Sequence, residues 1–314
     1  MKAKTLVIGG AVVIGVPALL VLVAVVTLYM LFHFPQDPSS TTGTIVSSGQ
    51  QREYLLYVPT SYDPTHPSPL VISLHPAMSW PSSEMQISHW NRVADENGFL
   101  VVYPSGLGTG AKTWYLSGRR TPSRMPDVVF ISQLIDTLEA HYNIDPMRIY
   151  ADGMSNGGGM AFALSCTLSH RIAAVGAVSA AQSLGWDWCT NTTPVPMIAF
   201  HGTADPIVPY DGAGTSWLNP DPFPNVRWWA ARWARRNRCA PAPAQSRVAA
   251  DVVRIEYTHC ADDATVVLYT IDGGGHQWPG GRRLPEWIVG HGTRSIDATR
   301  LMWAFYRKHP LRRQ

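Results

Sequence analysis

A six-residue run, Gly-Met-Ser-Asn-Gly-Gly at 153–158, places the strongest constraint on how this chain folds. A stretch expected to form a strand (148–151) leads directly into it, and a helical pattern follows at 157–168. Glycine on either side of Ser155 lets a strand and a helix approach closely, while the serine takes a strained backbone conformation. The run therefore predicts a sharp strand–turn–helix unit that lifts the Ser155 hydroxyl above the end of a sheet.

Strand and helix patterns alternate from about residue 43 onward, which predicts one α/β domain with a mostly parallel sheet flanked by helices. The chain has 314 residues, of which 46% are hydrophobic and 15% charged, enough for one such domain and a short appendage. Asp127 and Ser295 are expected to cap two of the helices. The expected strands are 53–58, 70–74, 99–103, 148–151, 173–178, 197–200 and 266–271, and the expected helices are 83–96, 128–141, 157–168, 225–237 and 295–308.

A serine hydroxyl is a weak nucleophile until a base removes its proton, so Ser155 needs partners. Behind a turn of this kind the acid and the histidine follow in that order, each after a later strand. Asp205 follows the strand 197–200 in HGTADPIVPY, with Asp211 as its nearest competitor, and His276 lies in the glycine-lined segment DGGGHQWPGG. The sequence therefore predicts a catalytic triad of Ser155, Asp205 and His276.

Negative charge that develops on a substrate oxygen needs two backbone N–H donors. Asn156, directly after the serine and at a helix N-terminus, is expected to supply one of them. The other should come from the loop after strand 70–74, which reads HPAM. Pro76 has no N–H, so Ala77 is the expected donor and Met78 the second choice.

Four further side chains are expected close to this constellation: Trp278 follows His276 by two residues, Trp114 lies in the long loop 105–127 above the sheet, and two histidines lie at strand ends. Trp278 and Trp114 are expected either to stack on a sugar or phenolic ring of a substrate or to pack in the core. His75 and His201, at strand ends, are expected to hydrogen-bond neighbouring loops and not to transfer protons.

Residues 5–32 form a long apolar run without a charged side chain. A helix of roughly 20 residues crosses a bilayer core, so this run predicts one uncleaved transmembrane anchor, in preference to the shorter apolar region of a signal peptide. Lys2 and Lys4 precede the run and no Lys or Arg follows until Arg52, which keeps residues 1–4 cytoplasmic and the rest outside. Residues 33–43 are rich in Pro, Ser and Thr and are expected to link the anchor to a catalytic domain at 44–314.

All four cysteines fall in the part expected to be exported: Cys166, Cys189, Cys239 and Cys260. An even number in an oxidising compartment favours two disulfides over buried free thiols, and none has the C-x-x-C spacing of a zinc site. Three pairings are open, of which neighbours in sequence close the shortest loops.

The formal net charge is +3, and several arginines cluster in the expected helix 225–237 and just after it. They share that helix with two tryptophans, so a solvated helix face is favoured over an anion-binding patch. No feature of the sequence indicates binding of nucleic acid.

Five motifs occur in register between about residues 54 and 305: LHPAM, GFLVVYP, IDPMRIYADGMSNGGGMA, HGTADPIVPY and GGGHQWPG. Through them the chain resembles the polyhydroxybutyrate depolymerase-like and feruloyl esterases, which are α/β-hydrolases. The resemblance implies hydrolysis of a carbohydrate, phenolic or hydroxyalkanoate ester outside the cytoplasm, through an acyl-enzyme on Ser155 and without a cofactor. It also matches paired cysteines of that family to Cys166 and Cys189, and to Cys239 and Cys260. A serine peptidase of the same fold and a non-catalytic surface binding protein are the alternatives.

The anchor hypothesis predicts that the amino-terminal segment stays on the mature protein. Protease added outside intact cells should digest the catalytic domain while the first residues remain protected. Amino-terminal sequencing of the mature protein is the check, and a chain that starts at or after His33 would show a cleaved signal peptide.

Overall fold

The computed structural model describes residues 34–116, 125–180, 188–214 and 222–312. Ten strands of the described residues form a single sheet. They are β1 (Thr41–Ser47), β2 (Gln50–Tyr57), β3 (Ser68–Leu74), β4 (Leu100–Pro104), β5 (Ile144–Gly153), β6 (Ala174–Val178), β7 (Met197–Gly202), β8 (Ala244–Ala249), β9 (Val252–Tyr257) and β10 (Val266–Ile271). The helices are α2 (Pro81–Ser88), α3 (Trp90–Asn97), α4 (Pro126–His141), α5 (Asn156–Thr167), α6 (Val226–Arg236), α7 (Glu286–Val289) and α8 (Ala298–Tyr306), with a 3-10 turn at Ala261–Asp263.

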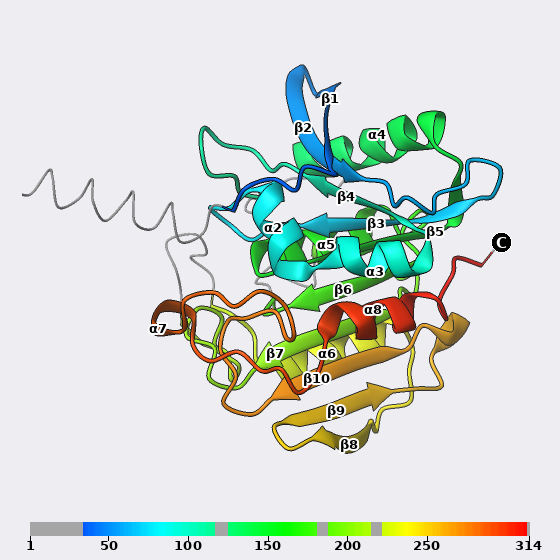
Figure 1. Ribbon diagram of the computed structural model, residues 1–314. Helices are drawn as coiled ribbons and strands as arrows, with labels where there is room; N and C mark the ends of the chain where they lie inside the picture. The colour runs from blue at the N-terminus through cyan, green and yellow to red at the C-terminus, as the bar shows by residue number, and fades with distance from the viewer. Residues whose placement is uncertain (1–33, 117–124, 181–187, 215–221, 313–314) are drawn as a thin grey trace, which may run out of the picture.

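The strand order is β1-β2-β4-β3-β5-β6-β7-β10-β9-β8, and the strands from β4 to β10 in this order are mutually parallel. Antiparallel strands complete both edges. Helices α2, α3 and α8 cover one face of the sheet, and α4, α5 and α6 cover the other (Figure 1). The carboxyl ends of the parallel strands all lie at the same end of the sheet, so the loops after β3, β4, β5, β7 and β10 gather at that end.

Every strand and helix expected from the sequence is present within a few residues of its predicted bounds. The sequence did not predict β1, β8 and β9, which are all antiparallel strands near an edge. The expected helix 83–96 is two helices, because His89 takes a left-handed conformation with φ 58° and ends α2. Residues 41–43, assigned to the linker, belong to β1, and Phe34 is already buried in the domain. The domain therefore begins before residue 44.

Both predicted helix caps are wrong. Asp127 lies inside the first turn of α4, whose N-cap is Met125 and has no side-chain bond. Asp297, not Ser295, caps α8 and accepts a hydrogen bond from the Arg300 N–H. In both cases the expected cap lies two residues from the observed N-cap.

The structure contains two disulfides, Cys166–Cys189 and Cys239–Cys260, which confirms the pairing of neighbours in sequence. The first joins the last turn of α5 to the segment before β7, and the second joins the end of α6 to the turn after β9. Each bond closes a loop of about 20 residues, which stabilises the fold by roughly 3 kcal/mol in the chain-entropy view.

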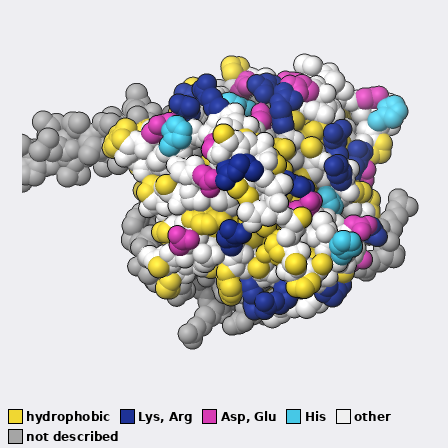
Figure 2. Space-filling model, turned by 90° about the horizontal axis from the view of Figure 1, so that it is seen from below, with side chains coloured by type: hydrophobic (Ala, Val, Ile, Leu, Met, Phe, Trp, Pro, Cys, Tyr) yellow, Lys and Arg dark blue, Asp and Glu magenta, His cyan; other side chains and the backbone are white. Residues whose placement is uncertain are grey.

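Arg235 and Arg238 are exposed, as expected of a solvated helix face. Arg236 instead donates to the carbonyl and the hydroxyl of Ser165 at 2.6 and 2.9 Å, and so ties α6 to α5. Burial lowers the pKa of Arg236 to about 10. Figure 2 shows basic and acidic side chains interspersed over one face of the molecule, with hydrophobic ones between them.

The predicted anchor (5–32) and the tail before it lie outside the described residues. Across the described ranges from 34 to 312, no helix combines the length and the apolar character needed to span a bilayer.

A buried ion pair fixes the loop after β4. Arg52 on β2 contacts Asp127 on α4 at 2.6 Å, and both side chains are buried. The other carboxylate oxygen of Asp127 accepts the Tyr115 N–H at 2.8 Å, and Arg52 donates to the Ser105 carbonyl at 2.9 Å. The pair therefore holds both ends of the described part of this loop, which passes beside Ser155.

Replacement of Asp127 by Asn should lower the free energy of unfolding by about 3 kcal/mol, because it leaves the buried Arg52 without a charged partner. Asp136→Asn is the matched control, since Asp136 is exposed and pairs with Arg171. Loss of this pair should change the free energy of unfolding by no more than experimental error. Urea unfolding of both variants measures the difference, and equal stability would show that the buried pair contributes little.

Candidate active site

Ser155 stands in the sharp turn between β5 and α5 that the sequence predicts. Its backbone is strained, with φ 54° and ψ −121°, and its N–H donates to the Val178 carbonyl of β6 at 2.8 Å. Gly157 permits the turn, because a Cβ there would lie 1.9 Å from the Leu74 carbonyl oxygen. Because glycine has no Cβ, the serine turn can pack directly against the end of β3.

Asp205 and His276 are brought together from the loops after β7 and β10, which are neighbouring parallel strands. The Nδ1–H of His276 donates to Asp205 Oδ2 at 2.8 Å, and both side chains are buried. The other carboxylate oxygen accepts the N–H groups of Ile207 and Val208 at 2.8 Å each. Burial raises the pKa of Asp205, but His276 and these hydrogen bonds outweigh it, so the pKa lies below its usual value. An ionised Asp205 fixes the ring of His276 with Nε2 free to accept a proton.

Ser155 lies two strands away from the Asp205 loop and is linked to it through β6. The Ser155 N–H bonds Val178 at the end of β6, and the next residue, Ser179, donates to Phe200 of β7 at 2.8 Å. Among the described residues no hydrogen bond of the Ser155 hydroxyl is present. Hydrogen bonds of this kind are often long without substrate and shorten when it binds.

Two backbone N–H groups beside Ser155 have no acceptor among the described residues, those of Ala77 and Asn156. They come from the loop after β3 and from the first residue of α5. Met78, the second choice for a donor, is already bonded to the Thr113 hydroxyl at 3.2 Å. The arrangement suits the stabilisation of an oxyanion by Ala77 and Asn156.

His75 joins the two loops that flank this pair of donors. Its Nδ1–H donates to the Pro76 carbonyl at 2.7 Å, and its Nε2 accepts the Gly106 N–H at 3.0 Å. Burial lowers the pKa of His75 to about 4, so the ring is neutral and can both donate and accept. His201 likewise donates to the Val208 carbonyl at 2.9 Å. Both histidines hydrogen-bond loops, as the sequence predicts.

Trp114 and Trp278 are both buried, which favours core packing over stacking on a substrate. Trp114 is 1% exposed, and its indole donates to the His75 carbonyl at 2.9 Å. Trp278 is 2% exposed and donates to the Thr299 hydroxyl at 2.9 Å. Core packing, the alternative weighed for both residues, is what the structure contains.

Sequence reasoning missed the side chain of Asn156. Its Oδ1 accepts the Trp114 N–H at 2.8 Å and its Nδ2 donates to the Trp114 carbonyl at 3.2 Å. The residue after the serine therefore holds the β4–α4 loop with its side chain, while its own N–H stays available. An amide next to the serine is the only sequence signal for this contact.

A second missed feature is a pair of buried carboxyls beneath the serine turn. Ser73 contacts Asp152 at 2.8 Å and Glu84 at 3.2 Å, and all three side chains are fully buried. A serine has one hydroxyl proton and donates to one acid at a time, so both contacts are hydrogen bonds only when one carboxyl carries a proton. Burial raises the pKa of Asp152 to about 7, and burial together with the charge of Asp152 raises that of Glu84 well above its usual value.

The raised pKa of Asp152 predicts a stability that depends on pH. Between about pH 4 and pH 7 the folded protein keeps a proton on Asp152 that the unfolded chain has released, so a rise in pH lowers the free energy of unfolding. Asp152→Asn removes this group. Between about pH 4 and pH 7 the melting temperature of this variant should therefore fall less than the melting temperature of the wild type. The exposed Asp272→Asn is the control, and parallel curves for Asp152→Asn and wild type would contradict the assignment.

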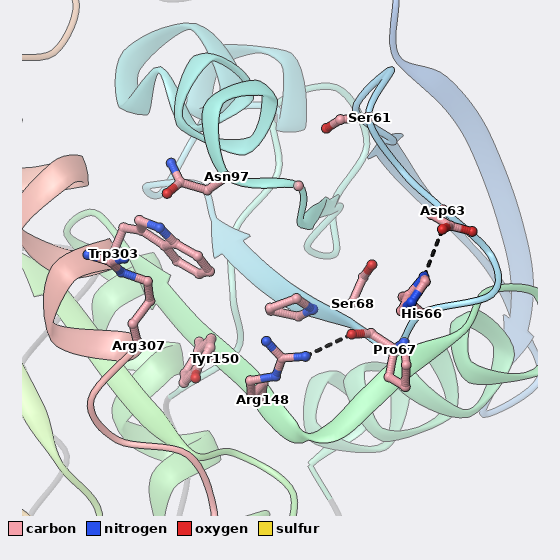
Figure 3. Close-up of a pocket in the computed structure, with 12 residues that line it drawn as sticks. Ser61, Asp63, His66, Pro67, Ser68, Asn97, Arg148, Tyr150, Trp303 and Arg307 are labelled. Atoms are coloured by element: carbon pink, nitrogen blue, oxygen red, sulfur yellow. Dashed lines mark hydrogen bonds and ion pairs between the residues drawn. The ribbon is translucent and has the colours of Figure 1, made fainter.

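A surface hollow of about 630 Å³ lies at the opposite end of the sheet (Figure 3). Ser68 at the start of β3 and Arg148 in the first half of β5 line it, together with Trp303 of α8 and Arg307 directly after that helix. Arg148 contributes little free charge, because it bonds Asp145 and the Pro67 carbonyl. The hollow is therefore separate from the Ser155 turn, which is at the carboxyl ends of the strands.

Comparison with known proteins finds similar proteins that are named esterases. The sequence model of the family described as esterase PHB depolymerase matches residues 52–208. A bifunctional acetylxylan esterase/xylanase of Neocallimastix patriciarum is 35% identical over 162 residues, which cover 52% of this chain and 22% of that protein. Feruloyl esterase B of Piromyces equi is 29% identical over 231 residues, 72% of this chain and 42% of the relative. The chain thus spans less than half the length of either relative.

Among solved structures, an acetyl xylan esterase from Aspergillus awamori superposes with a TM-score of 0.57. The match covers 76% of this chain and 94% of that protein, at 17% sequence identity. At this identity the match establishes a shared fold.

Proposed function

The chain belongs to the esterase PHB depolymerase family, and on that premise we propose that it hydrolyses carboxylic esters with Ser155 as the nucleophile. The observation that carries the proposal is the buried hydrogen bond from His276 to Asp205, in loops that share one edge of the sheet with the Ser155 turn. The same bond leaves Nε2 of His276 as the available base.

In the first half of the reaction, Ser155 Oγ attacks the ester carbonyl carbon while His276 Nε2 takes the hydroxyl proton. The carbonyl oxygen becomes an oxyanion, which accepts hydrogen bonds from the N–H groups of Ala77 and Asn156. When the tetrahedral intermediate collapses, the C–O bond to the alcohol breaks and His276 returns the proton to the leaving oxygen. An acyl group remains on Ser155.

In the second half, a water molecule replaces the alcohol and His276 acts as its base. The acid leaves, the proton returns to Ser155, and Asp205 keeps the imidazole in one orientation throughout. No redox or metal step is required by this scheme.

The names of the relatives suggest the first substrates. Acetylxylan and feruloyl esterases occur among them, so acetyl and feruloyl esters of carbohydrates are the leading candidates, with hydroxyalkanoate oligomers third. Hydrolysis rates over a panel of these esters rank the candidates directly.

We also propose that the apolar run 5–32 anchors the chain in a membrane, with the catalytic domain on the outer side. The run is long enough to span, and its flanking charges favour this orientation. The two disulfides support an oxidising compartment for the domain.

Ser155→Ala should keep the fold and lose about 10⁴- to 10⁶-fold in kcat on a p-nitrophenyl ester. Asp205→Asn should lose about 10⁴-fold, because Asn no longer holds the His276 tautomer. Asp211→Asn is the matched control and should keep near wild-type activity. Labelling by a fluorophosphonate should be abolished by Ser155→Ala, slowed by Asp205→Asn and kept by Asp211→Asn. Retention of a tenth of the wild-type rate by Ser155→Ala would contradict the mechanism, and unlabelled wild type would favour a non-catalytic binding protein.

A further inference from the structure

Large hydrophobic side chains are exposed at the carboxyl ends of the strands, the end of the sheet that carries the Ser155 turn. Of the seven that are exposed among the described residues, four lie in segments that follow the carboxyl ends of parallel strands, three of them on loops and Trp287 on α7. The other three lie on β1, α6 and β8. Hydrophobic atoms also reach the surface elsewhere (Figure 2), so exposure alone identifies no docking face. The four residues, named here the mouth rim, are Met78, Tyr115, Ile207 and Trp287 at 52%, 59%, 41% and 77% exposure.

The mouth rim has two halves on either side of the catalytic groups. On one side, Ser79 and Lys112 exchange backbone hydrogen bonds and so hold Met78 beside the loop of Tyr115. On the other side, α7, which bears Trp287, is bonded to the His276 loop, because the His276 N–H donates to Val289 at 2.6 Å. The rim is therefore held by the same loops that position the catalytic residues.

The described chain also begins at this end of the molecule. Phe34 is buried, and the Arg282 guanidinium lies 4.1 Å from the centre of its ring. Arg282 belongs to the segment between His276 and α7, and its N–H donates to the Ile87 carbonyl of α2. Figure 1 shows the start of the described chain at the end where α2, α7 and the arrowheads of β3, β6 and β7 lie.

The length of the apolar run fixes how far this end can stand from a bilayer. Residues 5–32 number 28, and as a helix at about 1.5 Å per residue they would span about 42 Å. A bilayer with its headgroup regions is about 40–45 Å thick. Only His33 separates the run from the buried Phe34, and one residue extends the chain by at most about 3.6 Å.

We infer that the mouth rim rests on the outer surface of the lipid bilayer, so that the active site takes esters that are dissolved in the membrane. Trp and Tyr suit this position, because their rings are stable at the boundary between headgroups and hydrocarbon. Lys112, near the rim, has no acidic partner among the described residues and can meet an anionic headgroup, whereas the charge of Arg283 is shared with Glu286 at 3.5 Å. The inference rests on the proposed esterase function and on the proposed anchor.

The test uses the full chain reconstituted in vesicles of phosphatidylcholine and phosphatidylglycerol. Two substrates are compared: p-nitrophenyl acetate, which is soluble in water, and p-nitrophenyl laurate dissolved in the bilayer. Trp287→Ser and Tyr115→Ser remove one apolar side chain from each half of the rim. Two controls are Trp287→Phe, which keeps the apolar surface, and Leu311→Ser, which changes a side chain near the start of β5 at the other end of the sheet.

Each rim variant should lose about tenfold in kcat/KM on the laurate, as expected for one large apolar contact, and change less than twofold on the acetate. Both controls should behave as the wild type on both esters. Equal effects of the rim variants on the two esters, no effect on either, or a full chain that does not float with vesicles would each overturn the inference. If the wild type hydrolyses neither ester, the proposed esterase function fails instead.

Discussion

The close contact between Gly157 and the carbonyl of Leu74 is the constraint on which the active site depends. It brings the start of α5 against the end of β3, and therefore sets the Asn156 N–H and the Ala77 N–H on two segments that touch. Any side chain at residue 157 would push these segments apart, since its Cβ would overlap the carbonyl oxygen. An oxyanion hole requires donors fixed to within a fraction of an ångström. Here the lack of a Cβ at Gly157 allows the close packing that fixes them.

The parts of the fold that could be predicted are those with local signals. Short apolar stretches mark the parallel strands, and glycines next to Ser155 and His276 mark loops that only glycine permits. The β8 strand has no such signal, because it lies at the sheet edge and is exposed along most of its length. The break between α2 and α3 also has no sequence signal, since the residue that takes the left-handed conformation there is His89 and not a glycine.

The roles of individual side chains were harder to predict than their positions. Trp114 was weighed evenly between substrate stacking and core packing, and the His75 carbonyl that its buried indole bonds is 39 residues away in sequence. Asp127 was recognised as an acid at a helix start, yet its partner Arg52 lies 75 residues away. Contacts of this separation leave no periodic trace in the sequence, so only the folded structure distinguishes a cap from an ion pair.

Helix α5 is held at both ends by different chemistry. At its start, the strained Ser155 and its hydrogen bond to Val178 fix the turn, while near its end Cys166 is bonded covalently to Cys189. Thiols stay reduced in the cytoplasm and oxidise outside it. On the proposed export of the domain, a newly made chain would carry Ser155 on a helix that lacks its covalent attachment, and would gain the Cys166–Cys189 bond only after translocation. The proposed export would thus couple the last covalent step of folding, closure of the Cys166–Cys189 disulfide, to passage across the membrane.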